Sequence, residues 1–277
     1  MRKNIILLAF AALTVTTAGK AQAESFQFAP PPFPVLNLRS VDIEKNSGLD
    51  YINMKVGDFS FNAVNFGGSR AVKMWDRGGF SLGGNIMLIF ASGDFGGTGK
   101  KATLFGEGFG IQPNWYFDLK GDEEDDFSLP VYFGPHVSLN MLMGSIPLGG
   151  GYTAFLTATT IMYGWQAGIQ AGVNLNDSIK FIPYVDFSQE VGGGVATSFS
   201  SSLGSSSTSM SIKSVPVAMS PGFDFKLRKV NLSLGGALKN SVQDSKDPTS
   251  GVVTRTKSKT TVFHLRFQTK FRSICGI

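Results

Sequence analysis

Residues 163–188 decide the fold, and they read YGWQAGIQAGVNL, then NDS, then IKFIPYVDFS. Apolar side chains occupy the odd positions of both longer runs, and polar or small side chains occupy most even positions, which is the period of a β-strand. Asn176, Asp177 and Ser178 are short polar residues that tolerate turn conformations. The stretch therefore predicts a long β-hairpin. We expect Trp165 and Ile169 to face lipid, because that face is apolar and aromatic, whereas the Gln- and Gly-rich face suits an enclosed wet interior.

Residues 1–23 have the features of a secretory signal peptide. Arg2 and Lys3 give a basic start, residues 5–15 form an uncharged apolar run, and Ala21-Gln22-Ala23 is a small-x-small cleavage signal. We therefore expect the protein to be exported and residues 1–23 to be removed. Residues 24–34 contain four prolines, which favour an extended, unpaired backbone, so this segment is predicted to be a Pro-rich periplasmic tail.

The remaining residues, 35–277, have the size and composition of one β-barrel domain. Outside the leader, 22 basic residues stand against 20 acidic ones, so nucleic acid is not expected as a partner. No window of the mature sequence approaches the roughly 18 apolar residues of a transmembrane helix, so strands must carry the chain across a membrane. The single cysteine, Cys275, excludes an internal disulfide.

Alternating segments recur along the chain and predict an all-β fold, an antiparallel up-and-down transmembrane β-barrel. Tight connections after Leu175 and Leu227 alternate with longer ones, as in barrels with short periplasmic turns and long outer loops. Ten strands are expected if residues 35–45 form a strand, and eight if the early region packs as a plug or tail. The alternating segments are 35–45, 50–66, 80–90, 103–117, 127–141, 155–175, 179–188, 215–227, 230–239 and 261–271.

Several segments between these strands are predicted to be connections. Residues 67–79 are basic with one Trp, which favours a turn at the membrane surface. Residues 192–214 contain ten Ser and cannot bury a core, so they are predicted to be a long exposed loop, and 240–259 a second polar loop. Residues 122–126 are all acidic and lack calcium-loop spacing, which favours a solvated turn.

Glu107 is the exception on the predicted lipid-facing side of its strand. An unpaired carboxylate is most unfavourable at the middle of a membrane. We therefore expect the strand to place Glu107 near an interface, or a local bulge to turn it inward.

The chain resembles bacterial outer-membrane β-barrel proteins in its leader, its serial alternating strands and the aromatics Phe263, Phe267 and Phe271 of its last strand. The resemblance covers nearly all of the mature sequence. It implies location in the outer membrane, with outer-membrane lipid and the barrel-assembly machinery as partners. In that class the last strand usually ends at the C-terminal aromatic residue, whereas residues 272–277 follow Phe271 here.

The polar face of the predicted strands gives the candidate site residues. With no catalytic, cofactor or metal pattern in the sequence, we expect a structural, narrow-pore or surface-binding role with little or no conductance, and the partner would be a small solute or a surface ligand. Binding specificity would then lie in the loops at 192–214 and 240–259. The lumen-lining candidates are Gln112, His136, Ser138, Gln166, Gln170, Lys180, Asp186, His264, Arg266 and Lys270.

His136 and Ser138 form the one pair with a catalytic appearance, because spacing of two places imidazole and hydroxyl side by side on a strand. The pair resembles the His-x-Ser element of outer-membrane lipid A deacylases. In that family the site faces lipid, whereas here the pair points inward, and no acid between Ser138 and the far end of the next strand could orient the ring. We therefore expect no enzyme activity. A lipid hydrolase using His136 and Ser138 and a secreted soluble β-protein remain the alternatives.

Overall fold

The computed structural model describes residues 43–56, 59–94, 101–120, 127–147, 152–202, 204–213, 215–246 and 253–271. This part of the chain forms one antiparallel sheet of thirteen strands, and it contains no helix long and apolar enough to cross a membrane. The predicted leader, the Pro-rich tail, the acidic turn and residues 272–277 lie outside the described residues. The strands are β1 (Ile43–Val56), β2 (Phe59–Trp75), β3 (Gly78–Asp94), β4 (Lys101–Asp118), β5 (Phe127–Ser128), β6 (Pro130–Pro147), β7 (Thr153–Gln170), β8 (Gly172–Asn176), β9 (Ile179–Ser201), β10 (Gly204–Lys213), β11 (Ala218–Leu227), β12 (Leu232–Lys246) and β13 (Val253–Phe271).

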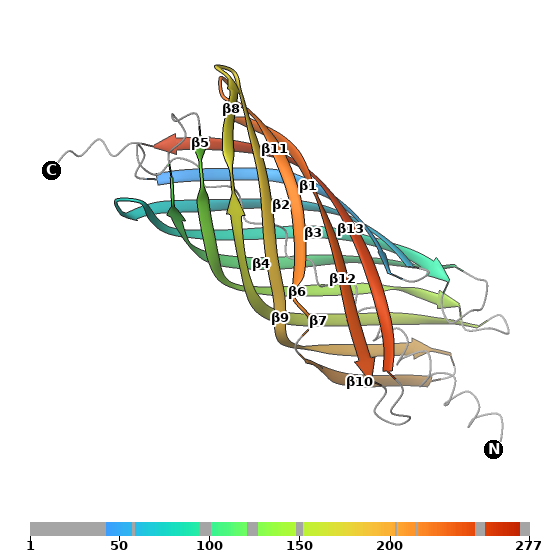
Figure 1. The fold of residues 1–277 in the computed structure, drawn as a ribbon. Coiled ribbons are helices and arrows are strands. Elements are labelled where there is room, and N and C mark those ends of the chain that lie inside the picture. The colour runs from blue at the N-terminus through green and yellow to red at the C-terminus, as the bar shows by residue number, and fades with distance from the viewer. Residues whose placement is uncertain are drawn as a thin grey trace.

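The sheet closes on itself into a barrel (Figure 1). β1 pairs with β13, where Ile43 lies opposite Phe271, and β9 pairs with β11, where Ser188 lies opposite Ala218. Three passes through the wall are interrupted, because β5 continues into β6, β7 into β8 and β10 into β11, so the thirteen strands make ten passes. The predicted antiparallel barrel of ten strands is confirmed.

The two ends of the barrel differ. The first strand begins and the last strand ends at the same end of the barrel as the tight turns at residues 76–77 and 177–178. We call this the turn end. At the opposite end, the loop end, β1 passes to β2 and Asp94 pairs with Lys101. This arrangement of tight turns and chain ends agrees with the topology expected from the lengths of the connections.

The hairpin at 163–188 forms as predicted. β7 and β8 pair with β9, and the chain turns at Asp177 and Ser178. The Asn176 side chain accepts hydrogen bonds from the backbone N–H groups of Ser178 and Ile179, both at 2.9 Å, so a local Asx-type turn fixes the connection.

The boundaries predicted for the first two strands are wrong. β1 runs without a break through residues 46–49, which separate the predicted strands 35–45 and 50–66, and β2 extends through residues 67–75, where the sequence predicts a surface connection. Residues 35–42 lie outside the described residues. The glycines do not end these strands, because Gly48 and Gly67 lie opposite each other and both edges of the pair are hydrogen-bonded. Only Asp76 and Arg77 turn the chain into β3.

The two predicted polar loops are also largely strand. Residues 192–201 complete β9 and pair with β10, while β12 reaches Lys246 and β13 starts at Val253. Residues 204–209 are exposed on both faces, whereas Val195, Phe199 and Ile212 of the same hairpin are buried in the apolar interior. The prediction that residues 192–214 form an exposed loop without a core is therefore wrong.

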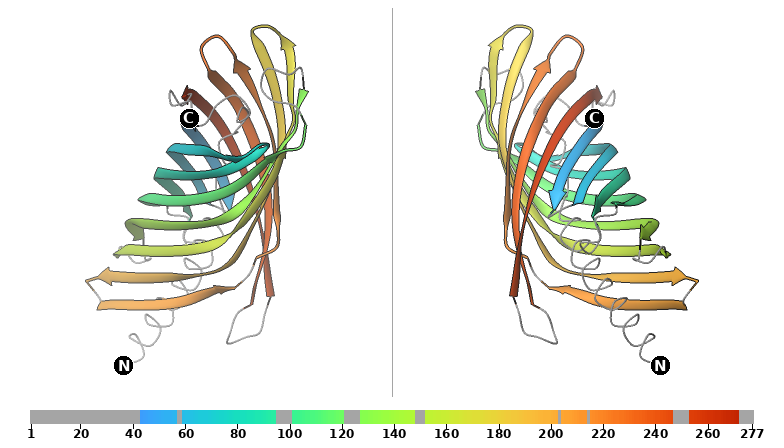
Figure 2. Two further views of the ribbon diagram at one scale, coloured as in Figure 1. Left: turned by 90° about the vertical axis from the view of Figure 1, so that its left-hand side faces the viewer. Right: turned by 90° about the vertical axis from the view of Figure 1, so that its right-hand side faces the viewer.

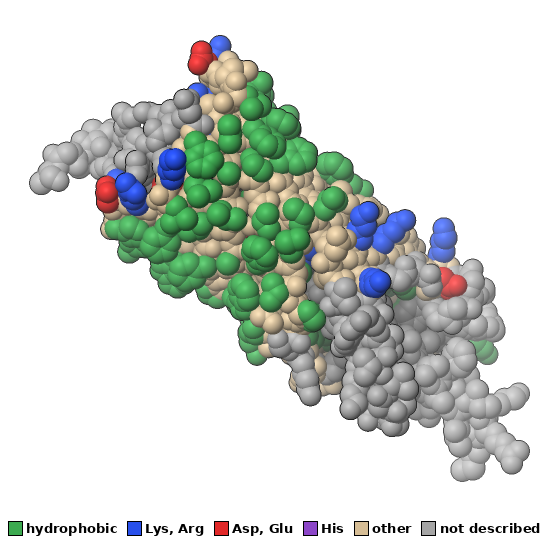
Figure 3. Space-filling model, viewed as in Figure 1, with side chains coloured by type: hydrophobic (Ala, Val, Ile, Leu, Met, Phe, Trp, Pro, Cys, Tyr) green, Lys and Arg blue, Asp and Glu red, His purple; other side chains and the backbone are tan. Residues whose placement is uncertain are grey.

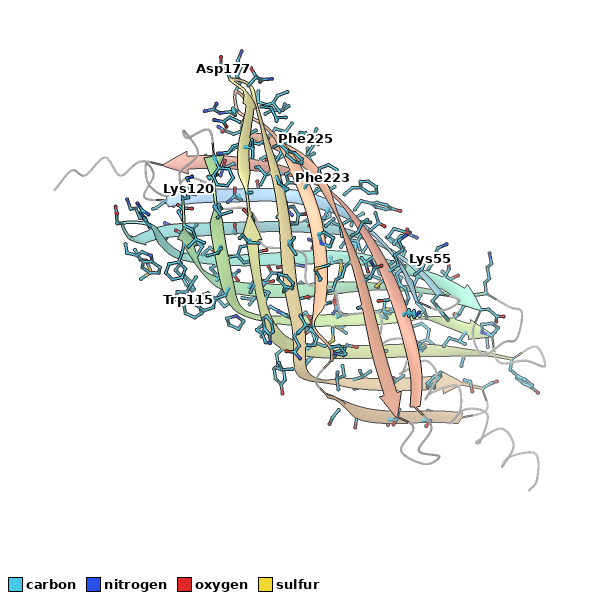
Figure 4. All side chains as sticks on the ribbon, viewed as in Figure 1. Lys55, Trp115, Lys120, Asp177, Phe223 and Phe225 are labelled. Carbon is cyan, nitrogen blue, oxygen red and sulfur yellow. The ribbon has the colours of Figure 1, made fainter. Side chains whose placement is uncertain are left out.

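Large apolar side chains cover the outside of the barrel. In the face shown in Figure 3 they form a broad band, and charged groups lie toward the ends. Trp75, Trp115, Phe117 and Phe133 make ring contacts near the turn end, with Phe117 5.3 Å from Trp75 between centroids, and Phe90 contacts Phe105 nearer the loop end. Two aromatic groups at different heights of an apolar band are typical of membrane barrels. The Trp115, Phe223 and Phe225 side chains project from the outer face of the wall (Figure 4).

Glu107 faces outward and is exposed. The pairing of β4 with β3 and β6 runs through this position without a register shift, so the alternative of a bulge that turns it inward is wrong. It lies closer to the loop end of β4 than to the turn end, with only Thr103 and Lys101 beyond Phe105 on the same face.

We predict that Ile111→Arg destabilises the barrel by about 2–4 kcal/mol, because Ile111 is 58% exposed and lies midway between Phe105 and Phe117 on the outward face. Thr103→Arg, on the same face near the loop end, should cost about 0–1 kcal/mol. Denaturant unfolding in lipid vesicles measures both values. Equal costs for the two substitutions would show that this face does not lie in lipid.

Candidate functional site: the barrel interior

The inward faces of the strands divide the barrel interior into two layers. Going from the turn end to the loop end, buried side chains on β1 change from Glu44, Asn46 and Asp50 to Ile52 and Met54. Every second residue of a strand points inward. Where the inward side chains of several passes change from polar to apolar at the same height, they form two layers. The same change occurs on β2, β3, β4, β6, β7 and β9, whereas Lys239 on β12 and Ser258 and Thr260 on β13 are buried toward the loop end.

The polar layer lies toward the turn end. Within the described residues, six acidic and four basic side chains are buried, so the charges of this layer are close to balance. Burial of charges is unfavourable unless they are paired, so the layer must be a network of contacts. Its principal members are Glu44, Asp50, Gln112, Asn114, Tyr132, His136, Gln166, Gln170, Lys180, Tyr184, Asp186, Ser188, Glu190, Asp224, Lys226, Lys239, His264, Arg266 and Gln268.

Asp224 and Arg266 form the centre of the network. Arg266 Nη1 lies 3.4 Å from Asp224 Oδ2, and His264 Nε2 lies 3.0 Å from Asp224 Oδ1. The Tyr184 hydroxyl is 3.0 Å from the same His264 nitrogen. Asp50 Oδ1 lies 3.8 Å from His264 Nδ1, so β1, β9, β11 and β13 meet at this cluster.

Asp50 connects the cluster to β2 and β3, the next two strands of the wall. Asn65 Nδ2 donates to Asp50 Oδ2 at 2.8 Å, and Asn85 Nδ2 donates to Asn65 Oδ1 at 2.8 Å. The hydrogen bonds therefore run from β1 through β2 to β3. Gln166 Nε2 donates to Asn114 Oδ1 at 3.1 Å and joins β7 to β4 in the same layer.

A second group of contacts lies on β6, β9 and β12. His136 Nε2 is 2.9 Å and 3.0 Å from the two carboxylate oxygens of Glu190. The Tyr132 hydroxyl donates to Asp186 at 2.9 Å, and Lys239 Nζ donates to Ser188 Oγ at 2.9 Å. Lys226 donates to the Gln268 side chain nearer the turn end. Charged side chains therefore cross-link strands that are not neighbours in the wall.

The apolar layer lies toward the loop end and is made of buried side chains from β1 to β10. Phe59, Phe61 and Ala63 come from β2, and Met87 and Ile89 from β3. They form one contiguous apolar cluster with residues of the other passes. The remaining members include Ile52, Met54, Ala91, Ala102, Leu104, Leu142, Ile146, Ala154, Leu156, Met162, Val195, Phe199 and Ile212.

The structure buries eight of the ten site residues expected from the sequence. Ser138 is half-buried, and the side chain of Lys270 lies outside the described residues. That these residues line a path for a solute stays a prediction. The eight buried residues are Gln112, His136, Gln166, Gln170, Lys180, Asp186, His264 and Arg266.

Several members of the network were missed. Asp224 and Lys226 occupy even positions of a strand that was recognised, so the alternation rule applied to that strand finds them. Glu190 was missed because the strand was ended at Ser188. The argument that no acid could orient His136 is therefore wrong, since Glu190 comes from a strand 54 residues away in sequence.

The geometry bears on two kinds of chemistry, metal binding and nucleophilic catalysis. No group of three or more His, Cys, Asp and Glu side chains in the described part of the chain could hold a metal ion. His136 has an acid partner at Nε2, while its buried Nδ1 makes no hydrogen bond. The imidazole is thus oriented, but it is not bonded to Ser138.

The comparisons with known proteins give the fold. No protein-family model matches the chain, and no curated protein matches its sequence. The chain is similar to the outer membrane protease OmpT from Escherichia coli, with 9% identity, a TM-score of 0.50, and coverage of 86% of this chain and 99% of that chain. It is also similar to the translocator domain of the autotransporter NalP from Neisseria meningitidis, with 8% identity, a TM-score of 0.46, and coverage of 93% and 97%. At such identities the similarity to OmpT establishes fold and not activity, and the chain has the fold of a bacterial outer-membrane β-barrel.

Proposed function

We propose that this protein is an outer-membrane barrel that holds a small apolar molecule in its apolar layer and is closed to ions by its polar layer. The observation that supports this most is the change of the inward faces from charged to apolar along successive passes. A barrel that only spans the membrane does not require such a division. A water-filled pore needs polar inward faces along its whole length.

The polar layer supports closure. Ions cross a barrel through water, and here polar side chains from strands that are not neighbours contact each other inside the barrel, as Tyr132 on β6 contacts Asp186 on β9 and Tyr184 on β9 contacts His264 on β13. An eight-stranded barrel has an interior that side chains just fill, and the diameter grows roughly in proportion to strand number. A ten-stranded barrel with Lys180, Lys226 and Tyr116 fully buried therefore has little space for water at this height.

The apolar layer supports binding of an apolar molecule. Its side chains offer few hydrogen-bond partners for water, and water needs two to four such partners to occupy a buried site. Four inward positions, on β2, β3, β4 and β7, are alanine, namely Ala63, Ala91, Ala102 and Ala154. Small side chains in a barrel wider than eight strands leave room for a ligand of modest size.

The outer surface supports placement in a membrane. Large apolar side chains cover it, and aromatic groups occur at two heights of the band. Since the fold is that of outer-membrane barrels, we place the protein in the outer membrane, with the turn end toward the periplasm.

We predict that a small alkyl alcohol carrying a photoreactive diazirine inserts into inward-facing residues of the apolar layer, such as Phe61, Leu104 and Leu156. Mass spectrometry of the illuminated protein in lipid vesicles maps the insertions. Ala91→Phe fills the apolar layer and should reduce insertion at inward residues at least about tenfold, since volume added to a packed interior displaces its contents.

Ala167→Phe is the matched control, because Ala167 lies on the outward face of β7 and its replacement leaves the interior unchanged. Insertion confined to outward residues in the unaltered protein would overturn the proposed function. Equal reduction by Ala91→Phe and Ala167→Phe would also count against it.

The contact between His136 and Glu190 favours lipid hydrolysis as a second candidate, because a carboxylate that orients an imidazole is one requirement of a nucleophilic site. The other requirement is a bond from the ring to the nucleophile. His136 Nδ1 makes no hydrogen bond, and the pair faces the interior rather than lipid. We therefore rank this candidate below the binding role.

We predict no release of fatty acid when the purified protein is incubated with lipopolysaccharide or phospholipid in detergent. Ser138→Ala and Glu190→Gln are the matched controls for the nucleophile and the orienting acid. Release that disappears in both variants would establish the hydrolase in place of the binding role.

A further inference from the structure

The hydrogen bonding of the wall is interrupted at one place toward the loop end. β11 pairs with β12 only as far as the pair Met219 and Asn240. Beyond it, β10 pairs with β9 alone and β12 pairs with β13 alone, as far as the described residues extend. Figure 2 shows the β9–β10 hairpin and the β12–β13 hairpin leaving the wall in different directions.

The path of β9 accounts for this divergence. The register of β7 with β9 shifts after Tyr163, next to the glycines at 192–194. A Cβ on Gly193 would lie 2.3 Å from the Ile161 carbonyl oxygen, so the strand approaches β7 too closely for any other residue. Val215 N–H donates to the Glu190 carbonyl at 2.9 Å, which keeps the chain before β11 on β9 and away from β12.

Apolar side chains lie on both the inner and the outer side of the interruption. On the inside, Ile212 and Val215 are buried members of the apolar cluster. On the outside, Met219 and Leu238 are about half exposed at the edge of the apolar band, immediately before Asn240. Apolar surface therefore continues from the band to the interior, past the end of the paired strands.

The polar layer lies on the turn-end side of the interruption. Lys239 is buried, and its ammonium group donates to Ser188 on β9 at 2.9 Å, across the inner side of β11. A molecule that passes between β10 and β12 thus meets Ile212 on the β10 side, Asn240 and Ser241 on the β12 side, and the charged Lys239 toward the turn end.

We propose that the wall opens sideways between β10 and β12, and that an alkyl chain from the outer leaflet reaches the apolar layer through this opening. The inference rests on the proposed function, because it supplies the route to the same apolar layer. The occupant is a hydrocarbon chain, since Met219 and Leu238 outside the interruption and Ile212 and Val215 inside it are apolar. Residues 204–209 are exposed on both faces, and among the described residues β10 pairs with β9 alone.

The test uses a phospholipid whose acyl chain carries a diazirine near its end. Such a lipid stays in the bilayer, so it can reach inward-facing residues only through the side of the wall. With the full protein in vesicles, we expect insertion at Phe199, Ile212 and Phe61 after illumination. Cys275→Ser provides the background for cysteine pairs, because the sequence contains no other cysteine.

The substitutions Ser211→Cys on β10 and Ser241→Cys on β12 allow a flexible bismaleimide to join the two strands and close the opening. The cross-link should lower inward insertion of the phospholipid probe at least about tenfold. The matched control joins Asn53→Cys and Asn62→Cys in the same way. These positions lie opposite each other on the paired strands β1 and β2, so the cross-link leaves the opening unchanged. Ile212→Lys gives a second test without a cross-link, because it places a charge on the inner side of the opening.

The outcomes separate the route from the function. Inward insertion of the free alkyl probe without insertion of the phospholipid probe overturns the lateral route and leaves the proposed function standing. Unchanged insertion in both the 211–241 cross-linked protein and Ile212→Lys also overturns the route. If neither probe inserts at inward-facing residues, both proposals are overturned.

Discussion

The structure depends on one constraint: backbone N–H and C=O groups inside a hydrocarbon layer must be paired within the protein. The chain meets it by closing ten passes into a ring, in which the first pass, β1, pairs with the last, β13, and β9 pairs with β11. Open edges occur at the β10–β12 interruption, where the apolar band ends, and water or headgroups can pair the backbone there. The constraint thus explains both the closed wall and the position of its opening.

Closure of the ring creates the second feature of the molecule, an interior whose side chains have no access to bulk water. Charges placed there must find partners on other strands, and Asp224 on β11 does so with Arg266 and His264 from β13, on the far side of β12. Such contacts hold together strands that are not hydrogen-bonded to each other, because loss of one partner leaves a buried charge uncompensated. The apolar layer carries no such requirement, because its side chains need no hydrogen-bonding partner.

The sequence predicts the faces of the strands better than their ends or their neighbours. Period-two alternation identified the hairpin at 163–188 and the inward positions of Gln166 and Asp186, because burial acts on each side chain directly. Strand ends were misplaced at 192–214, since Ser and Gly pair through the backbone without leaving an apolar pattern. The contact of His136 with Glu190 depends on which strands lie beside and across from each other, and the periodicity of a single strand contains no information on that.

Ionic conductance of the purified protein in a planar bilayer tests the central claim most directly, which is that the charged layer closes the barrel. The account predicts no steady conductance for the unaltered chain, and measurable conductance when Asp224, His264 and Arg266 are all replaced by Ala, because the side chains that meet across the interior are then removed. A large, steady conductance of the unaltered protein would contradict the account, since it would require a continuous water path through the layer.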